Sequence, residues 1–468
     1  MSSAFKCFLA GLFGSEECSD CVVRFCLSKD VSDRCEAQPM EDDNAAEQPA
    51  GAREANAASA ADGGAPVDAT AIGEPLPAHS WVLRPGSSFF KSQLERWTAE
   101  QPAGSKPVLK VPVGCAEDVG HALAAIRYIY TGKLSVSSAA DLLGARRLAC
   151  YLGVEGATEA CNAGLLSISG VNAKPPSMAG VVELFACRHL LPAWDDDPTA
   201  AALVDGIRSA CQERLAAYKG AVTEFTMPGG DVNVPLGELL AWAFCGAPSV
   251  LSDPAADGRV GSLSAAALEA LLNCDAFATD NEASVLLLLA EWLDANPSTA
   301  DDVKKRLCGC IRLCQLSDVY LHGVLPRLQW FPLSAPELPL LFQALKMPEG
   351  KGRERLLACV AESGYIWPAA WISGAPRPRT RGDAGRTHEW SIAKADLGTA
   401  LRKLSESDPT VWLTSNFASG ADNVISNGFA LKAEVEVNRD LVAAGVYLVC
   451  SLPASLKLVP WADRQRDS

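Results

Sequence analysis

The sequence lacks several features that would mark particular kinds of protein. No apolar run approaches the roughly 18 uninterrupted residues of a membrane-spanning helix, so we expect no membrane span. Positive charge is in deficit, because 41 Lys and Arg residues stand against 56 Asp and Glu residues, a formal net charge of -15 at pH 7. Such a chain repels a phosphate backbone, which argues against direct binding to nucleic acids.

Motifs of common enzymes are also missing. Neither a Gly-x-Ser-x-Gly nucleophile elbow nor a phosphate-binding Gly-x-x-x-x-Gly-Lys-Ser/Thr run occurs. Asp20 and His79 could act as an acid and a base, but polar groups that become buried usually form structural hydrogen bonds. We therefore expect no catalytic residue and no cofactor, and an enzyme that uses Asp20 and His79 is the least favoured hypothesis.

Histidine is scarce, with five residues in the chain, and this limits the possible metal sites. Cys18-Ser19-Asp20-Cys21 has the spacing of half a zinc site, but no second pair with matching spacing completes it. Because Cys21 lies in a predicted strand, packing in the core is the favoured interpretation. We expect no metal.

Cysteine, in contrast, is plentiful. The 17 cysteines are scattered, many of them through apolar helical sequence, where a free cysteine behaves as a small hydrophobic residue. This favours a reducing intracellular compartment, either the cytoplasm or the nucleus. The apolar segment at residues 5–13 is short, carries one lysine and lacks a convincing cleavage site, so we do not expect a signal peptide.

Residues 35–74 differ from the rest of the chain in composition. They are rich in Ala, Asp, Glu, Gly and Pro and contain almost no large apolar residue, so they cannot bury enough apolar area to offset the entropy of ordering. We expect a disordered insertion there, between a first strand and the next ordered element.

Around this insertion, several motifs follow one another in a definite order. The first strand is Ser19-Asp20-Cys21-Val22-Val23-Arg24-Phe25, and the insertion is followed by Pro77-Ala78-His79-Ser80 and a short helix. An apolar strand at residues 108–113 precedes an amphipathic helix that ends at Tyr130-Thr131-Gly132, with glycine in its usual terminal position. A helical pair at residues 142–166 completes the series.

This series resembles the BTB/POZ domain, a small sheet with helices, which we place at residues 1–166. The resemblance implies that Asp20 and His79 fix the first strand and the following helix. It also implies that the N-terminal helix lies across a two-fold dimer interface formed by Phe5, Phe8, Leu9, Leu12 and Phe13. The alternative, that this helix packs only on its own domain, stays open.

Helical sequence resumes at residue 178 and continues to about residue 370. Three features of this region resemble the BACK domain, which follows BTB in many adaptor proteins. They are the segment Leu271-Leu272-Asn273-Cys274-Asp275, a helix that begins at Glu282 and ends in Glu291-Trp292-Leu293, and the segment Ile311-Arg312-Leu313. Asn281 or Asp280 is expected to cap the helix that opens at Glu282. An unrelated helical array with ordinary core leucines is the alternative.

The last part of the chain changes character. Residues 377–386 are basic and rich in Pro and Gly, as in a linker. Residues 388–457 contain β-branched and alternating runs at residues 390–392, 411–414, 429–437 and 445–452, which predict strands. The region resembles the small β-rich C-terminal part of plant BTB-BACK proteins. The predicted fold class is therefore α+β, with a BTB/POZ domain, a helical BACK region and a β-rich end.

The resemblance implies a non-catalytic adaptor that forms a homodimer and presents an unidentified protein substrate to a cullin-3-type RING ubiquitin ligase. The cullin interface would contain Leu94, Trp97, Glu100 and Tyr130. Cullin-binding relatives often carry a hydrophobic-x-Glu motif here, whereas Trp97 and Glu100 are three positions apart instead of two. The alternative is a dimeric scaffold or transcription-associated interaction protein that recruits no ligase.

Overall fold

The computed structural model describes residues 3–27, 70–100, 106–170, 178–193, 199–230, 232–380, 388–404, 409–418, 420–438 and 443–459. The chain mixes helices and strands and has a helical central region, as the predicted α+β class requires. It divides into two compact units, one of Met1–Ile168 with Ala186–Val204 and one of Ser169–Phe185 with Asp205–Ser468. Each unit is described by itself.

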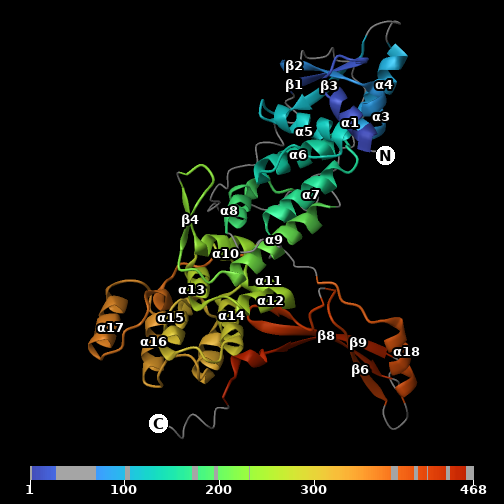
Figure 1. The fold of residues 1–468 in the computed structure, drawn as a ribbon. Coiled ribbons are helices and arrows are strands. Elements are labelled where there is room, and N and C mark those ends of the chain that lie inside the picture. The colour runs from blue at the N-terminus through green and yellow to red at the C-terminus, as the bar shows by residue number, and fades with distance from the viewer. Residues whose placement is uncertain are drawn as a thin grey trace, which may run out of the picture. The chain divides into compact units, whose positions relative to one another are not determined.

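The first unit contains a three-stranded sheet with β1 (Cys21–Leu27) in its centre (Figure 1). β2 (Ala71–Ala78) pairs with β1 in the antiparallel sense, and β3 (Val108–Val113) pairs with it in the parallel sense. Alternate side chains of a strand point to opposite faces, and on one face Val23 and Phe25 are at most 2% exposed. This apolar face forms the base of the core.

Helices cover that face and complete the first unit. Gly132 ends α5 with a φ of 63°, and its N–H donates to the Tyr128 carbonyl at 2.7 Å, so the predicted helix end is confirmed. The helices are α1 (Ser3–Leu12), α3 (Ser80–Gly86), α4 (Ser88–Glu100), α5 (Asp118–Thr131), α6 (Ala139–Tyr151) and α7 (Ala157–Ile168), with the short η1 (Arg188–Leu190).

The predicted insertion at residues 35–74 falls almost entirely on residues 28–69, which lie outside the described part of the chain. The predicted end of the insertion, at residue 74, lies too far along the chain, because β2 already begins at Ala71. The alternation of Ile72 and Leu76 with less buried neighbours lets this segment pack one side on the core of the first unit.

The second unit begins with helical sequence. Two helices, α8 (Ala179–Ala186) and α9 (Ala200–Ala217), cross the division between the units. A hairpin of β4 (Glu224–Thr226) and β5 (Asn233–Pro235) precedes α10 (Leu236–Phe244), α11 (Ala247–Leu251), α12 (Pro254–Gly261), α13 (Ala265–Asn273), α14 (Glu282–Ala295), α15 (Asp301–Cys308), α16 (Glu337–Lys346) and α17 (Lys351–Glu362). Short helical turns η2 to η5 connect the later helices: Leu313–Gln315, Val319–Val324, Leu325–Arg327 and Ala369–Ile372.

Helix α14 is the centre of this helical part. It is apolar on nearly all sides, with four consecutive leucines at 0% exposure, which is the pattern of a helix surrounded by others. Asn281 caps it by accepting from the Ala283 N–H at 3.0 Å, so the first of the two predicted caps is confirmed.

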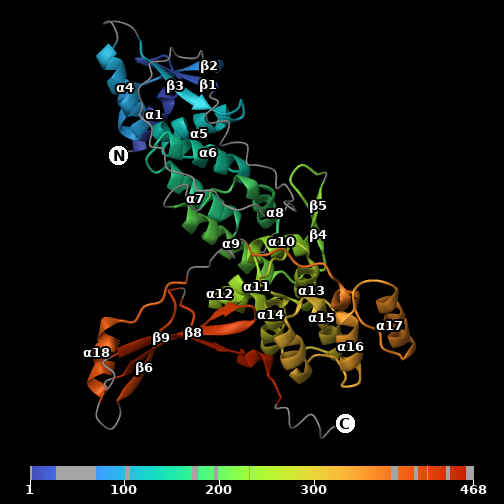
Figure 2. The ribbon, with the colours of Figure 1, turned by 180° about the vertical axis from the view of Figure 1, so that it is seen from behind.

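A four-stranded antiparallel sheet forms the C-terminal part of the second unit. β8 (Phe429–Asn438) is central and pairs along its length with β9 (Ala443–Ser451). On its other side it pairs with β6 (Thr410–Thr414) near one end and with β7 (Val424–Ser426) near the other. Figure 2 shows the sheet extending from the helices toward α18 (Lys394–Lys403), which contacts β6. The short η6 (Ala454–Leu456) follows.

The sequence pattern found three of these strands and missed two elements. β6, β8 and β9 lie where strands were expected, but Trp390 forms only an isolated bridge with Phe417. The short β7 and helix α18 were not predicted. The helical part and the sheet belong to one compact unit here, whereas the sequence suggested two separate parts.

Within the described ranges, no helix combines the length and the apolar character that crossing a bilayer requires.

Candidate functional site

Helix α1 has one side in the core of the first unit and one side at the surface. Leu9 and Leu12 are buried against the sheet and its covering helices, whereas Phe8 is 57% exposed. The side chain of Phe5 lies outside the described residues. Of the side chains expected at a dimer interface, Leu9 and Leu12 therefore pack on their own unit, whereas Phe8 faces outward.

Phe13, the last of those residues, joins the end of α1 to α5. Its ring stands edge-on to Tyr130 with the ring centres 5.6 Å apart, and the Arg127 guanidinium carbon lies 5.7 Å from the centre of the Phe13 ring. Both contacts are favourable, the first between aromatic quadrupoles and the second between a cation and a π-face. The position of α1 on the unit is thus fixed at its C-terminal end.

His79 lies at the centre of a buried hydrogen-bond network. Its backbone N–H donates to the Tyr130 hydroxyl at 3.0 Å, its Nδ1 lies 3.3 Å from the same hydroxyl, and its Nε2 lies 2.9 Å from the Glu17 carbonyl. One hydrogen arrangement satisfies all three contacts: Tyr130 donates to Nδ1, and Nε2 donates to Glu17. With 0% exposure and both nitrogens engaged, the ring has no free nitrogen to act as a base.

Asp20 makes a second link, between the start of β1 and the start of α3. Its Oδ1 accepts from the Ser80 N–H at 2.7 Å, and its Oδ2 accepts from the Ser80 hydroxyl. Partial burial would raise the pKa of Asp20, but the hydrogen bonds from Ser80 outweigh it and lower the pKa below its usual value. The carboxylate is thus held in its ionised, accepting form.

The residues expected at a cullin interface divide into two groups. Leu94 and Tyr130 are 7% and 2% exposed, so the structure corrects their assignment as contact residues. Helical periodicity had placed them on apolar faces correctly, but those faces turn into the core. The side chains of Trp97 and Glu100 lie outside the described residues, although both positions belong to α4.

The sequence interpretation did not single out Trp81, an exposed aromatic residue close to His79. Trp81 in α3 is 47% exposed and lies between the buried His79 and the buried Val82. Its ring stands edge-on to His79 at 6.4 Å. The signal was present in the sequence, because a helix whose Val82 and Leu83 face inward turns the preceding position toward solvent.

Cys18 and Cys21, which have the spacing of half a zinc site, lie in different environments, because Cys18 is exposed and Cys21 is buried. Cys21 is completely buried in β1, and burial together with the Asp20 carboxylate raises the pKa of its thiol to about 12. Zinc binds the thiolate form, which this environment disfavours. Among the described residues, no group of three potential ligands is arranged to hold a metal ion.

In the second unit, a buried ion pair fastens the start of α14. The Glu282 Oε2 lies 2.9 Å from the Arg377 Nε, and the two side chains are 1% and 0% exposed. Arg377 also donates to the Leu272 carbonyl at 2.7 Å, and the Arg312 N–H donates to Glu282 at 2.9 Å. The basic stretch that was expected to be a linker therefore begins with a core residue.

A tight turn fastens the C-terminal sheet to the same helix. Asn427 and Gly428, between β7 and β8, have φ values of 51° and 81°, as the two central residues of a type I′ hairpin turn require. The Asn427 N–H donates to Asp280 at 2.7 Å, and the Gly428 N–H donates to the Ser284 hydroxyl at 3.0 Å. The Asn-Gly pair is a strong hairpin signal that the sequence interpretation did not use.

Gly428 fits this place because it has no side chain. A Cβ on Gly428 would lie 2.6 Å from the Tyr320 hydroxyl and 2.7 Å from the Ala283 Cβ. The Tyr320 hydroxyl donates to the Gly428 carbonyl, and its ring stands edge-on to Phe429 at 5.3 Å. The turn is thus embedded in the helical part of the second unit.

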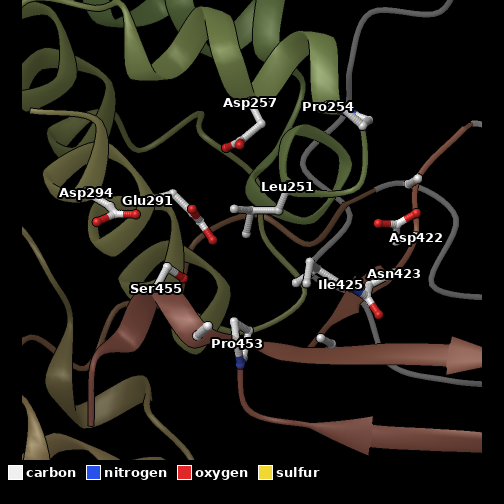
Figure 3. A pocket seen from close by; sticks show the side chains of 13 residues that line it. Leu251, Pro254, Asp257, Glu291, Asp294, Asp422, Asn423, Ile425, Pro453 and Ser455 are labelled. Carbon is white, nitrogen blue, oxygen red and sulfur yellow. The ribbon is translucent and has the colours of Figure 1, made fainter.

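An acidic pocket of about 440 Å³ lies between these helices and the sheet. Asp257 of α12 and Glu291 of α14 direct their carboxylates toward it, as Figure 3 shows, and Asp294 and Asp422 are also in its lining. Burial, followed by the charges of Glu291 and Asp253, raises the pKa of Asp257 to about 6. The pocket therefore concentrates negative charge.

Comparison with known families finds one match. The model of the BACK family, described as BTB And C-terminal Kelch, matches residues 256–326. The predicted resemblance to BACK is thereby confirmed for these residues, from α12 to η4. BACK domains are typical of BTB adaptor proteins, and the match is consistent with a role in protein interaction. The resemblances of residues 1–166 and of the C-terminal region stay predictions.

No curated protein matches the chain.

Proposed function

We propose that this protein is a BTB-BACK adaptor, which forms a homodimer and presents a protein substrate to a cullin-3-type RING ubiquitin ligase. The observation that carries the proposal is the BACK match at residues 256–326, which follows a separate mixed unit of strands and helices. In this proposal the first unit binds cullin and a second copy, the BACK region sets the spacing, and the C-terminal sheet recognises the substrate.

The order of elements in the first unit supports its assignment as a BTB/POZ domain. A helix precedes two antiparallel strands, and two helices, a third strand parallel to β1 and three further helices follow. The motif residues that carry the resemblance lie at the junctions of these elements. Asp20 links β1 to α3, and His79 links α3 to Tyr130 in α5.

In the proposed cullin interface, the four predicted residues take different roles. Leu94 and Tyr130 are core residues that fix the backbones of α4 and α5. Direct contact then falls to Trp97 and Glu100, near the C-terminal end of α4. Tryptophan is among the residues that contribute most to binding at interfaces.

Copurification of the full-length chain with purified cullin-3 tests the ligase proposal. We expect a stable complex, and we expect the double substitution Trp97→Ala with Glu100→Lys to weaken it at least tenfold, because a hot-spot tryptophan contributes roughly 2 kcal/mol or more. Trp412→Ala is the matched control: this tryptophan of β6 is 52% exposed but belongs to the second unit. Absence of any complex with the unmodified chain would refute the ligase proposal.

The displaced spacing of Trp97 and Glu100 favours one other candidate, a dimeric scaffold that recruits no ligase. In that case the protein would still bind partners through the same two units. Its bound partners would keep the same ubiquitination when the protein is deleted, whereas a ligase adaptor predicts a fall in their modification. Measuring that modification by mass spectrometry separates the two functions.

A further inference from the structure

The outer edge of β9 is open. One edge of the strand pairs with β8 over its whole length, residue Ala443 opposite Asn438 and residue Ser451 opposite Ala430. Among the described residues, no strand pairs with the opposite edge. The nine-residue sequence AAGVYLVCS contains neither a charge nor a proline, the two devices by which soluble proteins usually protect a free edge.

On one face of the sheet, the apolar side chains are buried on β8 but exposed on β9. Val435 and Val437 of β8 are at most 9% exposed. Val446 lies directly opposite Val435 and therefore on the same face, yet it is 73% exposed, and Leu448 on that face is 64% exposed. The layer that is covered over β8 thus continues uncovered onto β9.

On the other face, the largest side chain of β9 leans away from the open edge. The Tyr447 ring lies over Gly445, where an added Cβ would be 2.7 Å from the ring. It points inward across the sheet to Trp412 of β6, with ring centres 5.4 Å apart, and it hydrogen-bonds to Glu436 of β8. The backbone of β9 is therefore left accessible for pairing along its outer edge.

We infer that β9 pairs with β9 of a second copy of this chain, in the antiparallel sense about a two-fold axis at Tyr447. Tyr447 is the midpoint of the strand, so this register alone pairs all nine residues of both copies. It places Val446 of each copy opposite Leu448 of the other, on the same face, which continues the apolar layer across the axis.

The uncharged, self-matching sequence of β9 explains why a second copy is the partner that fits. Two chains that each carry a formal net charge of -15 repel one another over most of their surfaces. The uncharged edge of β9 is a strip where two copies meet without bringing like charges into direct opposition. Its length and the alternation of its apolar side chains are matched by its own sequence, so the interface needs no other partner.

This contact differs from the proposed dimer interface at α1 and does not depend on the ligase proposal. The two contacts use different units of the chain, and each can be removed separately. The pairing of β9 therefore adds a second means of self-association to a protein whose first unit is proposed to form a dimer.

Disulfide trapping tests the register. Residues directly opposite one another in an antiparallel pair have Cβ atoms about 5 Å apart, close enough for a disulfide after small adjustments. We expect Tyr447→Cys, in a Cys450→Ser background, to form a 447–447 cross-link under mild oxidation, identified by mass spectrometry of the linked peptide. Val449→Cys in the same background is the control, because that residue would face Gly445 of the other copy.

Sedimentation analysis of the full chain tests the association itself. Val446→Lys with Leu448→Lys places like charges opposite one another across the axis, so we expect the dissociation constant of this contact to rise roughly tenfold or more. The matched control is Val222→Lys with Val232→Lys, two valines of the same unit that are 55% and 57% exposed. Thermal unfolding of each variant checks that the fold is kept.

Both experiments are repeated in a Phe8→Asp background, which removes the proposed α1 contact. The inference holds if the β9 substitutions weaken self-association by the same factor with and without Phe8→Asp, and if the 447–447 link forms. It is overturned if the mass of the β9 variant matches that of the unmodified chain at every concentration, or if the linked peptide joins β9 to another protein.

Discussion

Two regions of the second unit differ in which groups they bury: one buries charged side chains, and the other leaves apolar side chains exposed. Around the start of α14, the charges of Glu282 and Arg377 are buried, and each is matched by a partner within the same unit. Along β9, the apolar side chains of Val446 and Leu448 lie at the surface. A region that satisfies its buried charges internally contributes to stability, whereas a region that leaves apolar groups and backbone at the surface is suited to binding.

The largest effect on stability is expected from breaking the buried ion pair of Glu282 and Arg377. Glu282→Ala leaves the Arg377 guanidinium buried without its counter-charge, so we expect the free energy of unfolding to fall by about 3–5 kcal/mol. Chemical denaturation followed by circular dichroism measures this change.

Glu269→Ala is the matched control for that prediction. Glu269 also pairs with an arginine, Arg306 at 3.0 Å, but both side chains are partly exposed. We expect its loss to cost less than about 1 kcal/mol. Equal effects of the two substitutions would contradict the view that burial gives the Glu282 pair its importance.

A smaller effect on stability is expected at the turn that attaches the C-terminal sheet to the start of α14. In Gly428→Ala the new methyl group meets the Tyr320 hydroxyl and Ala283, and the residue keeps a positive φ, so we expect a loss of about 3 kcal/mol. Gly420→Ala isolates the backbone cost of about 1 kcal/mol, because Gly420 has a φ of 83° and no neighbour within 4 Å of the added Cβ. A Gly428 effect no larger than this control would show that the turn is not embedded.

The smallest effect concerns the acidic pocket and depends on pH. The folded-state pKa of Asp257, about 6, exceeds the usual aspartate value of 3.8, so the folded state binds more protons between these values. Stability from this group is therefore present below pH 3.8 and is lost as the pH rises through 6. Allowing for solvent screening, we expect Asp257→Asn to stabilise the protein by about 1 kcal/mol at pH 7.

The gain from Asp257→Asn should disappear as the pH falls from 6 to 4, since the carboxyl group is then neutral in the folded protein. Thermal unfolding at several pH values provides the measurement. Asp302→Asn serves as the control because Asp302 also lies in the first turn of its helix, α15, but is exposed. A constant gain at all pH values would refute the assigned cause.

Local patterns in the sequence predicted local structure well. The glycine at 132 and the asparagine at 281 marked a helix end and a helix start, because both act through their immediate neighbours. The BACK resemblance was also found from short motifs, and the family match falls on the same residues.

Long-range partners could not be predicted in this way. Arg377 lies in basic, Pro- and Gly-rich sequence, and its partner Glu282 is 95 residues away, so nothing near Arg377 indicated that it is buried. Leu94 and Tyr130 show the same limit for the candidate site. Periodicity identified their helix faces as apolar, but whether a face turns to the core or to a partner depends on the packing of the whole unit.

The turn at Asn427 and Gly428 also affects the chemical ageing of the chain. In an Asn-Gly sequence, the glycine nitrogen can attack the carbonyl carbon of the preceding side-chain amide and expel ammonia, and water then opens the resulting cyclic imide to leave a carboxylate. Here the Gly428 N–H donates a hydrogen bond to the Ser284 hydroxyl, and both residues are held in a fixed conformation. Release of the sheet from α14 would free the nitrogen for this reaction, so a chain that had once come apart at this point would carry a lasting negative charge there.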